Sequence, residues 1–207
     1  MNRVAHPIER RSYDIARTRL AATGLDTAAL PPWTRAVVER VVHASADIAY
    51  ATDLVCDEAA LCGAVDALAA GAPIVVDVRM TAAGITTGNV VCRLGDVDAG
   101  DAARAGLTRS AAAVGLALDE VGPGAVWVIG CAPTALERLL RVADVARPAL
   151  VIGLPVGFVG AVEAKDALRA AGLPAISNRS EKGGAAVAAA ALNALLYDTL
   201  LYKGLRS

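Results

Sequence analysis

The chain has 207 residues and a mass of 21.0 kDa, which is the size of one α/β domain and enough to bury a core without disulfides or a structural metal. Apolar residues make up 56% of the chain and the mean hydropathy is +0.49, yet no uninterrupted apolar run reaches the length of about 18 residues that a membrane-spanning helix needs. The formal net charge is −1, and no basic cluster is interleaved with aromatic residues, so we expect neither a nucleic acid nor a membrane as partner.

The first part of the chain carries helical patterns only. Apolar residues at helical spacing predict helices near residues 8–23, 32–44 and 53–70. We interpret residues 1–70 as a helical N-terminal arm that packs on an α/β core formed by residues 71–207. On this interpretation the whole chain, residues 1–207, is a single domain.

Short runs rich in valine and isoleucine alternate with alanine-rich helical patterns through the rest of the chain. The predicted strands are residues 73–78, 90–94, 125–130, 149–154 and 174–177, and the predicted helices are residues 110–120, 134–146, 159–171 and 184–202. Several strand runs are continuously apolar, which is typical of parallel strands covered on both faces. The sequence therefore predicts a three-layer α/β fold with a mostly parallel sheet flanked by helices.

The loops that follow these strands are rich in glycine and hydroxyl residues. In an open parallel sheet the ligand crevice lies beyond the carboxyl ends of the strands. Four predicted helix starts lie at that edge, near residues 108–110, 131–134, 155–160 and 177–184. Because a helix N-terminus presents unpaired N–H groups and a partial positive charge, we expect a ligand that carries several negative groups.

The glycine spacing after the fourth predicted strand separates this loop from nucleotide-binding loops. Gly153, Gly157 and Gly160 follow the pattern G-x-x-x-G-x-x-G rather than the dinucleotide fingerprint, and no P-loop lysine is present. Nucleotide binding is therefore disfavoured. The alternative that these glycines serve only tight turns and close helix–sheet packing stays open.

The four cysteines form no C-x-x-C pair and fall in apolar contexts, so we expect reduced, small core residues. The N-terminus has no apolar run of the kind that secretion requires, which predicts a cytoplasmic protein. With only two histidines in the chain, we expect no metal site.

His43 is the more interesting of the two histidines. His6 precedes Pro7 and is expected to be an ordinary exposed residue. His43 borders a stripe of valines at helical spacing, and Arg40 lies three residues before it on the same face. From these residues alone, a hydrogen-bonded structural histidine and a catalytic one both remain open.

Five motifs in order resemble one known family. They are Arg40-Val-Val-His43-Ala, Thr108-Arg109-Ser-Ala-Ala-Ala, Gly130-Cys-Ala-Pro-Thr-Ala-Leu136, Gly153-Leu-Pro-Val-Gly-Phe-Val-Gly-Ala161 with Glu163-Ala-Lys-Asp-Ala-Leu168, and Lys182-Gly-Gly with Ala190-Ala-Leu-Asn-Ala-Leu195. From about residue 8 to about residue 196, the chain resembles the precorrin-8X methylmutases of cobalamin biosynthesis, which are cobalt-precorrin-8 methylmutases in the anaerobic branch.

The resemblance implies an isomerase that moves a methyl group from C11 to C12 of a corrin precursor, giving hydrogenobyrinic acid or its cobalt counterpart, without a separate cofactor. His43 matches the family's proton donor and acceptor, and the residues that match substrate-contacting positions are Ser12, Arg40, Thr86 and Arg109. The implied substrate is a polycarboxylate tetrapyrrole, which fits the expected anionic ligand. The resemblance also implies a homodimer with the pocket near the subunit interface.

The sequence departs from the family pattern after Thr86. Thr87-Gly88-Asn89 follow at once, where the family has a longer stretch with arginine. This predicts weaker carboxylate binding at that edge. A non-catalytic carrier of the tetrapyrrole product and a generic nucleotide-binding domain remain as alternative functions.

Overall fold

The computed structural model describes residues 6–205, and it describes the side chains of residues 6–197. A six-stranded sheet lies at its centre, with the strand order β1-β6-β5-β4-β2-β3. All neighbouring strands are parallel except β1, which runs antiparallel to β6. The strands are β1 (Leu54–Cys56), β2 (Ile74–Val76), β3 (Val90–Val91), β4 (Val126–Ile129), β5 (Leu150–Gly153) and β6 (Ala175–Asn178).

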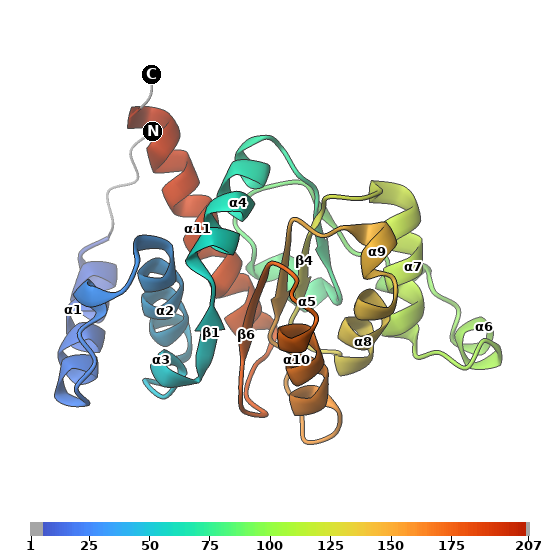
Figure 1. Ribbon diagram of the computed structural model, residues 1–207, viewed down its shortest axis with the longest axis horizontal. Helices are drawn as coiled ribbons and strands as arrows, with labels where there is room; N and C mark the ends of the chain where they lie inside the picture. The colour runs from blue at the N-terminus through green and yellow to red at the C-terminus, as the bar shows by residue number, and fades with distance from the viewer. Residues whose placement is uncertain (1–5, 206–207) are drawn as a thin grey trace.

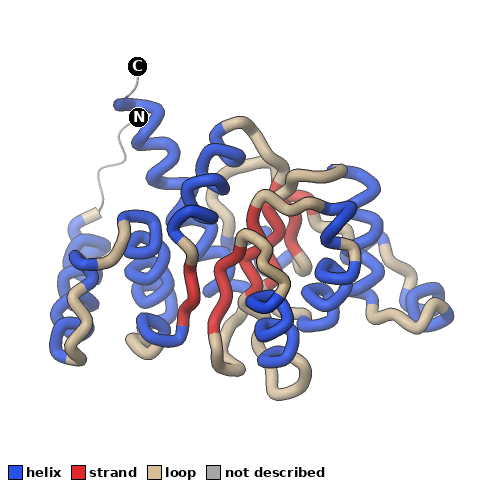
Figure 2. Tube along the Cα trace, viewed as in Figure 1, coloured by secondary structure: helices blue, strands red, loops and turns tan. Residues whose placement is uncertain are grey.

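Helices cover both faces of this sheet, as Figures 1 and 2 show. Val126 and Val128 of β4 pack into a core with α2 (Pro32–Ser45), α4 (Glu58–Ala69) and α11 (Ala185–Leu205). Trp127 and Ile129, which alternate with them, pack into a second core with α7 (Arg109–Val121), α8 (Pro133–Arg141) and α10 (Ala161–Ala170). Because β4 is buried on both faces, its sequence is continuously apolar. The predicted three-layer fold is confirmed.

The first helix, α1 (Pro7–Ala22), packs against α2. Leu20 inserts into the core, and Arg17 donates two hydrogen bonds of 3.0 and 2.7 Å to the carboxylate of Glu39 on α2. The remaining short elements are η1 (Thr27–Ala29), α3 (Tyr50–Asp53), α5 (Arg79–Gly84), η2 (Leu94–Asp96), α6 (Ala99–Arg104) and α9 (Ala143–Ala146).

The prediction that the first seventy residues are helical throughout is wrong at one segment. Residues 54–56 form β1, the antiparallel edge strand, and the helix predicted from residue 53 begins only at Glu58. Asp57 sets this start, because its carboxylate accepts hydrogen bonds from the N–H groups of Ala59 and Ala60. Three residues are too few to show the alternation by which a strand is recognised.

The expectation that the cysteines are reduced core residues is confirmed only in part, since Cys56 and Cys92 pack against the main core. All four are free, but Cys62 is exposed and Cys56, Cys92 and Cys131 are only partly buried. Among the described residues, no helix is both long enough and apolar enough to cross a membrane.

Two glycine-containing loops meet where β5 and β6 end. The N–H of Gly184 donates to the carbonyl oxygen of Leu154 at 2.9 Å, and the N–H of Gly157 donates to that of Glu181 at 3.1 Å. Gly183 adopts φ +157°, and a side chain there would collide with the backbone of Leu154. Close backbone approach therefore explains Gly183, whereas Gly184 has φ +127°, a conformation that other residues rarely adopt.

Candidate active site

His43 lies in the last turn of α2 and faces α1. Its Nδ1 shares a hydrogen bond of 2.8 Å with the hydroxyl of Ser12. The ring of Tyr13 stacks on the imidazole, with the ring centroids 4.8 Å apart and the planes 11° from parallel. No hydrogen bond to Nε2 is formed within residues 6–197. The imidazole is thus held at Nδ1 by Ser12 and at one face by Tyr13, while Nε2 is available to bind a ligand.

Arg40 lies three residues before His43 and joins three helices. Its Nη1 donates to the Glu9 carboxylate at 2.9 Å and to the Tyr13 hydroxyl at 3.3 Å. The guanidinium carbon lies 4.8 Å from the ring centroid of Tyr197 on α11, a cation–π contact. The predicted shared face of Arg40 and His43 is therefore the surface on which α1 and α11 meet α2.

The surroundings of His43 favour its neutral form. Burial lowers the pKa of the imidazole from its usual 6.5, and the positive charge of Arg40 lowers it further, while the negative charge of Glu9 acts in the opposite direction. A bound polyanion would add negative charge and raise this pKa again. The histidine is therefore placed where a charged ligand changes its protonation.

Two small cavities open beside these residues. One of about 90 Å³ contains His43 and is lined by Ser12, Ile15, Ala16, Arg19, Val42, His43, Ala46 and Ile48. The other, of about 200 Å³, contains Arg40 and is lined by Tyr13, Arg17, Ala36, Glu39, Arg40, Ala194 and Tyr197. Pockets for large organic ligands measure roughly 300–1,000 Å³. Each of these two cavities is smaller than that range.

Thr86 and Arg109 lie elsewhere. The N–H and hydroxyl of Thr86 donate to Oδ1 of Asn193 on α11, at 3.1 and 3.2 Å. Arg109 begins α7 and donates to the carbonyl oxygen of Leu94 at 3.1 Å. Figure 1 places α1 at one end of the molecule and α7 near the other. The fold brings together Ser12, Arg40 and His43, and in the described part of one chain no hydrogen bond links Thr86 or Arg109 to them.

The expectation of four open helix N-termini needs correction at α8. The carboxylate of Asp77, which follows β2, accepts hydrogen bonds of 3.2, 2.7 and 2.9 Å from the N–H groups of Gly130, Cys131 and Ala132. This buried side chain already supplies the negative charge there. At α7, the Thr108 hydroxyl caps the first turn. The N–H groups before α8 are therefore not free to bind a ligand's carboxylate.

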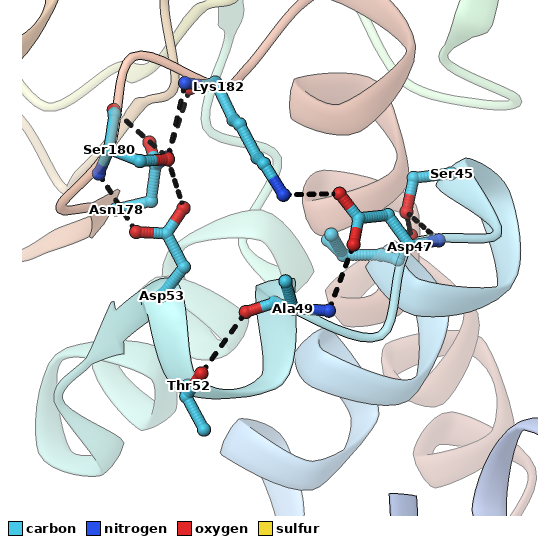
Figure 3. A network of polar contacts seen from close by, with 9 residues as sticks. Ser45, Asp47, Ala49, Thr52, Asp53, Asn178, Ser180 and Lys182 are labelled. Carbon is cyan, nitrogen blue, oxygen red and sulfur yellow. Dashed lines mark hydrogen bonds and ion pairs between the residues drawn. The ribbon is translucent and has the colours of Figure 1, made fainter. Parts of the chain in front are cut away.

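A polar network joins the end of α2 to the loop that precedes α11 (Figure 3). Lys182 Nζ contacts the Asp47 carboxylate at 2.6 Å. The Asp53 carboxylate accepts from the N–H groups of Arg179 and Ser180, at 2.9 and 2.8 Å, and from Asn178 Nδ2 at 2.8 Å. These contacts fix the segment after His43 against the loop that follows β6, at the carboxyl edge of the sheet.

Sequence reasoning missed Tyr13 and Glu9 on α1. Glu9, Tyr13 and Arg17 recur at every fourth position and so share one face of the helix. In the structure these three side chains contact Arg40 or Glu39 on α2. The polar stripe itself was a usable signal, but its partner helix could not be identified from α1 alone.

Comparisons with known proteins agree with the resemblance. The family model described as precorrin-8X methylmutase matches residues 7–198. A precorrin-8X methylmutase from Pseudomonas aeruginosa is 41% identical over 199 residues, covering 91% of this chain and 93% of the relative. A cobalt-precorrin-8 methylmutase from Methanocaldococcus jannaschii is 41% identical over 163 residues, covering 77% of each chain.

A solved structure extends this likeness to the fold. The crystal structure of precorrin-8X methyl mutase from Thermus thermophilus superposes with a TM-score of 0.83 at 35% sequence identity, covering 95% of this chain and 99% of that one. Because the family model, the Pseudomonas relative and the fold all span nearly the whole chain, the protein belongs to the precorrin-8X methylmutase family, the methyl-transferring isomerases of cobalamin biosynthesis.

Proposed function

We propose that the protein moves a methyl group from C11 to C12 of precorrin-8X or cobalt-precorrin-8, with His43 as the proton donor and acceptor. The observation that carries this proposal is the imidazole held through Nδ1 by Ser12 and by the ring of Tyr13, while Nε2 forms no hydrogen bond with the described side chains of residues 6–197. The reaction is an isomerisation, so its atoms balance within the substrate and it needs no separate cofactor. His43 donates a proton to the conjugated ring and accepts a proton back when the methyl shift is complete.

The chemistry fits the charge state of the site. Burial and Arg40 lower the pKa of His43, so the free protein holds it mainly neutral near pH 7. The substrate's carboxylates oppose this effect and bring the imidazole pKa closer to the working pH, where one group both gives and takes a proton efficiently. The Ser12 hydroxyl can form this hydrogen bond with either tautomer of His43, because it can donate to Nδ1 or accept from it.

Arg40, Ser12, Thr86 and Arg109 are proposed to contact the substrate. Arg40 shares its Nη1 donor between Glu9 and Tyr13, and guanidinium groups form strong charge-assisted bonds with carboxylates. Arg109 lies at the first turn of α7 with an exposed side chain, beside N–H groups that also favour anions. Thr86 extends the polar surface next to Asn193 of α11.

We further propose that the protein is a homodimer and that each site is built from both subunits. The cavities beside His43 and Arg40, at about 90 and 200 Å³, are too small for the macrocycle in one chain. Phe158 and Val159, in the loop before α10, are 94% and 89% exposed and form an apolar surface suited to association. We assign the reaction to the cytoplasm, since the four thiols are unpaired.

The test compares His43→Asn with His6→Asn, its control at the other histidine. Each protein is mixed with excess precursor and the visible spectrum is followed. We expect the wild type and His6→Asn to convert many equivalents, and His43→Asn to bind the ligand but lose turnover by at least about 100-fold. Turnover near the wild-type rate in His43→Asn would overturn the proton-transfer role. A wild type that binds product but converts no precursor would instead be a carrier.

A further inference from the structure

Tyr13 contacts both residues on which the proposed reaction depends. Its ring lies 4.8 Å from the His43 imidazole and 11° from parallel, and its hydroxyl accepts a hydrogen bond of 3.3 Å from Arg40 Nη1. Ser12, the preceding residue, holds Nδ1 of the same imidazole. Two consecutive residues of α1 thus contact His43 in different ways, one through an edge and one through a face.

A single hydrogen bond does not fix an imidazole. The torsion that turns a histidine ring is broad and roughly two-fold, so the ring can swing about the Ser12 contact or flip its nitrogens. A parallel aromatic ring against one face removes that freedom, because any large rotation drives the imidazole into it. With Tyr13 in place, Nδ1 stays on Ser12 and Nε2 stays on the opposite edge.

The stacked ring is itself held from several sides. Arg40 binds its hydroxyl, and the guanidinium carbon of Arg17 lies 5.7 Å from its centroid. Burial raises the pKa of the Tyr13 phenol, so the hydroxyl stays protonated at neutral pH. Arg40 Nη1 also donates to Glu9, so one donor on α2 is bound to two side chains of α1, those of Glu9 and Tyr13.

We propose that Tyr13 is a positioning residue for the methyl transfer: its ring holds the His43 imidazole so that Nε2 faces the substrate, and Arg40 holds that ring through the hydroxyl. The inference rests on the proposed role of His43. It assigns to Tyr13 no contact with the reacting atoms.

The decisive variants separate the ring from the hydroxyl. Tyr13→Phe keeps the stacked ring and loses the Arg40 contact, whereas Tyr13→Leu removes the ring. We expect Tyr13→Phe to keep kcat within about three-fold, and Tyr13→Leu to lose about 10- to 100-fold in kcat with little change in KM, as a misplaced catalytic group does. Thr18→Ala, an exposed substitution on the same helix, is the control and keeps both constants.

A second readout does not depend on turnover. The chain has only two histidines, so the imidazole signals of His43 are assigned in an NMR titration by comparison with His43→Asn. The groups that act on this imidazole are Arg40 on its own helix and Glu9 and Tyr13 on α1, with Arg19 lining the same cavity. Because burial lowers the pKa of His43, removal of the ring in Tyr13→Leu raises it, while Tyr13→Phe leaves it near the wild-type value.

Clear outcomes overturn the proposal. If Tyr13→Leu and Tyr13→Phe have the same kcat and the same pKa for His43, the Tyr13 ring does not position the imidazole. If Tyr13→Leu lowers only the melting temperature, Tyr13 is a packing residue. Should Tyr13→Leu fail to fold, Tyr13→Met fills the same space without a flat ring and takes its place. Turnover retained in His43→Asn would defeat the proposed function itself, and the titration would still report whether the Tyr13 ring buries the His43 imidazole.

Discussion

The protonation of His43 depends on neighbours that act in opposite directions. Burial lowers the pKa of the imidazole first, Arg40 lowers it further, and Glu9 raises it. Arg40 and Glu9 are also bound to each other at 2.9 Å, so each partly cancels the field of the other. The imidazole therefore reports changes in either charge.

Charge-removing variants of the two neighbours should move this pKa in opposite directions. Arg40→Met removes the positive charge and raises the pKa of His43, whereas Glu9→Gln removes the opposing negative charge and lowers it. Both values are measured by NMR titration of the free protein, with Thr18→Ala as a control that leaves the pKa unchanged. Shifts of the same sign in both variants would mean that structural rearrangement, not charge, governs the titration.

The sequence predicts one side of this residue cluster better than the other. Arg40 and His43 are three residues apart on one helix, so their shared face follows from helical geometry alone. Ser12 and Tyr13 contact His43 from α1, and they precede it in the chain by 31 and 30 residues. The resemblance supplied Ser12, but the stacking of Tyr13 depends on how α1 crosses α2, which the pattern of neither helix determines.

At the scale of elements, the loop between β6 and α11 is organised around one buried lysine. Lys165 of α10 is fully buried, and its ammonium donates to Asn178 Oδ1 at 3.0 Å, to the carbonyl oxygen of Lys182 at 2.9 Å and to that of Ser180. Burial lowers the pKa of this lysine to about 8. These three hydrogen bonds replace the bonds to water that the Lys165 ammonium gives up when it is buried.

Removing this lysine should destabilise the protein. Lys165→Met leaves the buried Oδ1 of Asn178 without this donor and removes one of two donors from the part-buried carbonyl oxygens of Ser180 and Lys182. An unsatisfied buried group costs about 1–3 kcal/mol, so we expect a loss of about 2 kcal/mol in the free energy of unfolding. The matched control is Lys182→Met, which removes an ammonium that is 40% exposed and paired with Asp47. Urea denaturation measures both, and the control is expected to change little. Equal losses in the two variants would contradict the role of burial.

The elements that the sequence predicted share a physical property. The long apolar strands and helices alternate because each must bury a face against the sheet, and this signal extends over many residues. The short elements β1, α3, α5 and α6, of three to six residues, carry no such period and were missed, whereas the equally short β2 and β3 were predicted from their valine and isoleucine runs. The helix predicted over residues 134–146 is divided at Val142, which separates α8 from α9.

At the scale of the whole molecule, Arg109 lies apart from the candidate residues around His43 within one chain. Ser12, Arg40 and His43 lie where α1 meets α2, while Arg109 begins α7 near the other end of the long axis (Figure 1). A sequence motif identifies residues that act on the same ligand, but it does not state whether they belong to one subunit. In a symmetric dimer, residues at opposite ends of a protomer can meet across the interface.

This arrangement predicts that two impaired variants restore each other, when they are assayed at a substrate concentration at which each alone shows little activity. His43→Asn and Arg109→Ala subunits carrying different tags are denatured together, refolded and assayed. With random pairing, half of the dimers contain one subunit of each kind, and in each of these one of the two sites is intact, so the mixture should recover about a quarter of wild-type activity. Size-exclusion chromatography with light scattering checks that dimers form.

The matched control pairs His43→Asn with Arg40→Met. Both residues lie on α2, so every site in that mixture carries at least one substitution, and refolding together should give no activity above that of Arg40→Met alone. Recovery in the first mixture but not in the second requires that Arg109 and His43 act on one substrate from different subunits. If the first mixture stays as inactive as its components while mixed dimers are isolated through their two tags, the shared site is wrong, and Arg109 must act within its own chain or not contact the substrate at all.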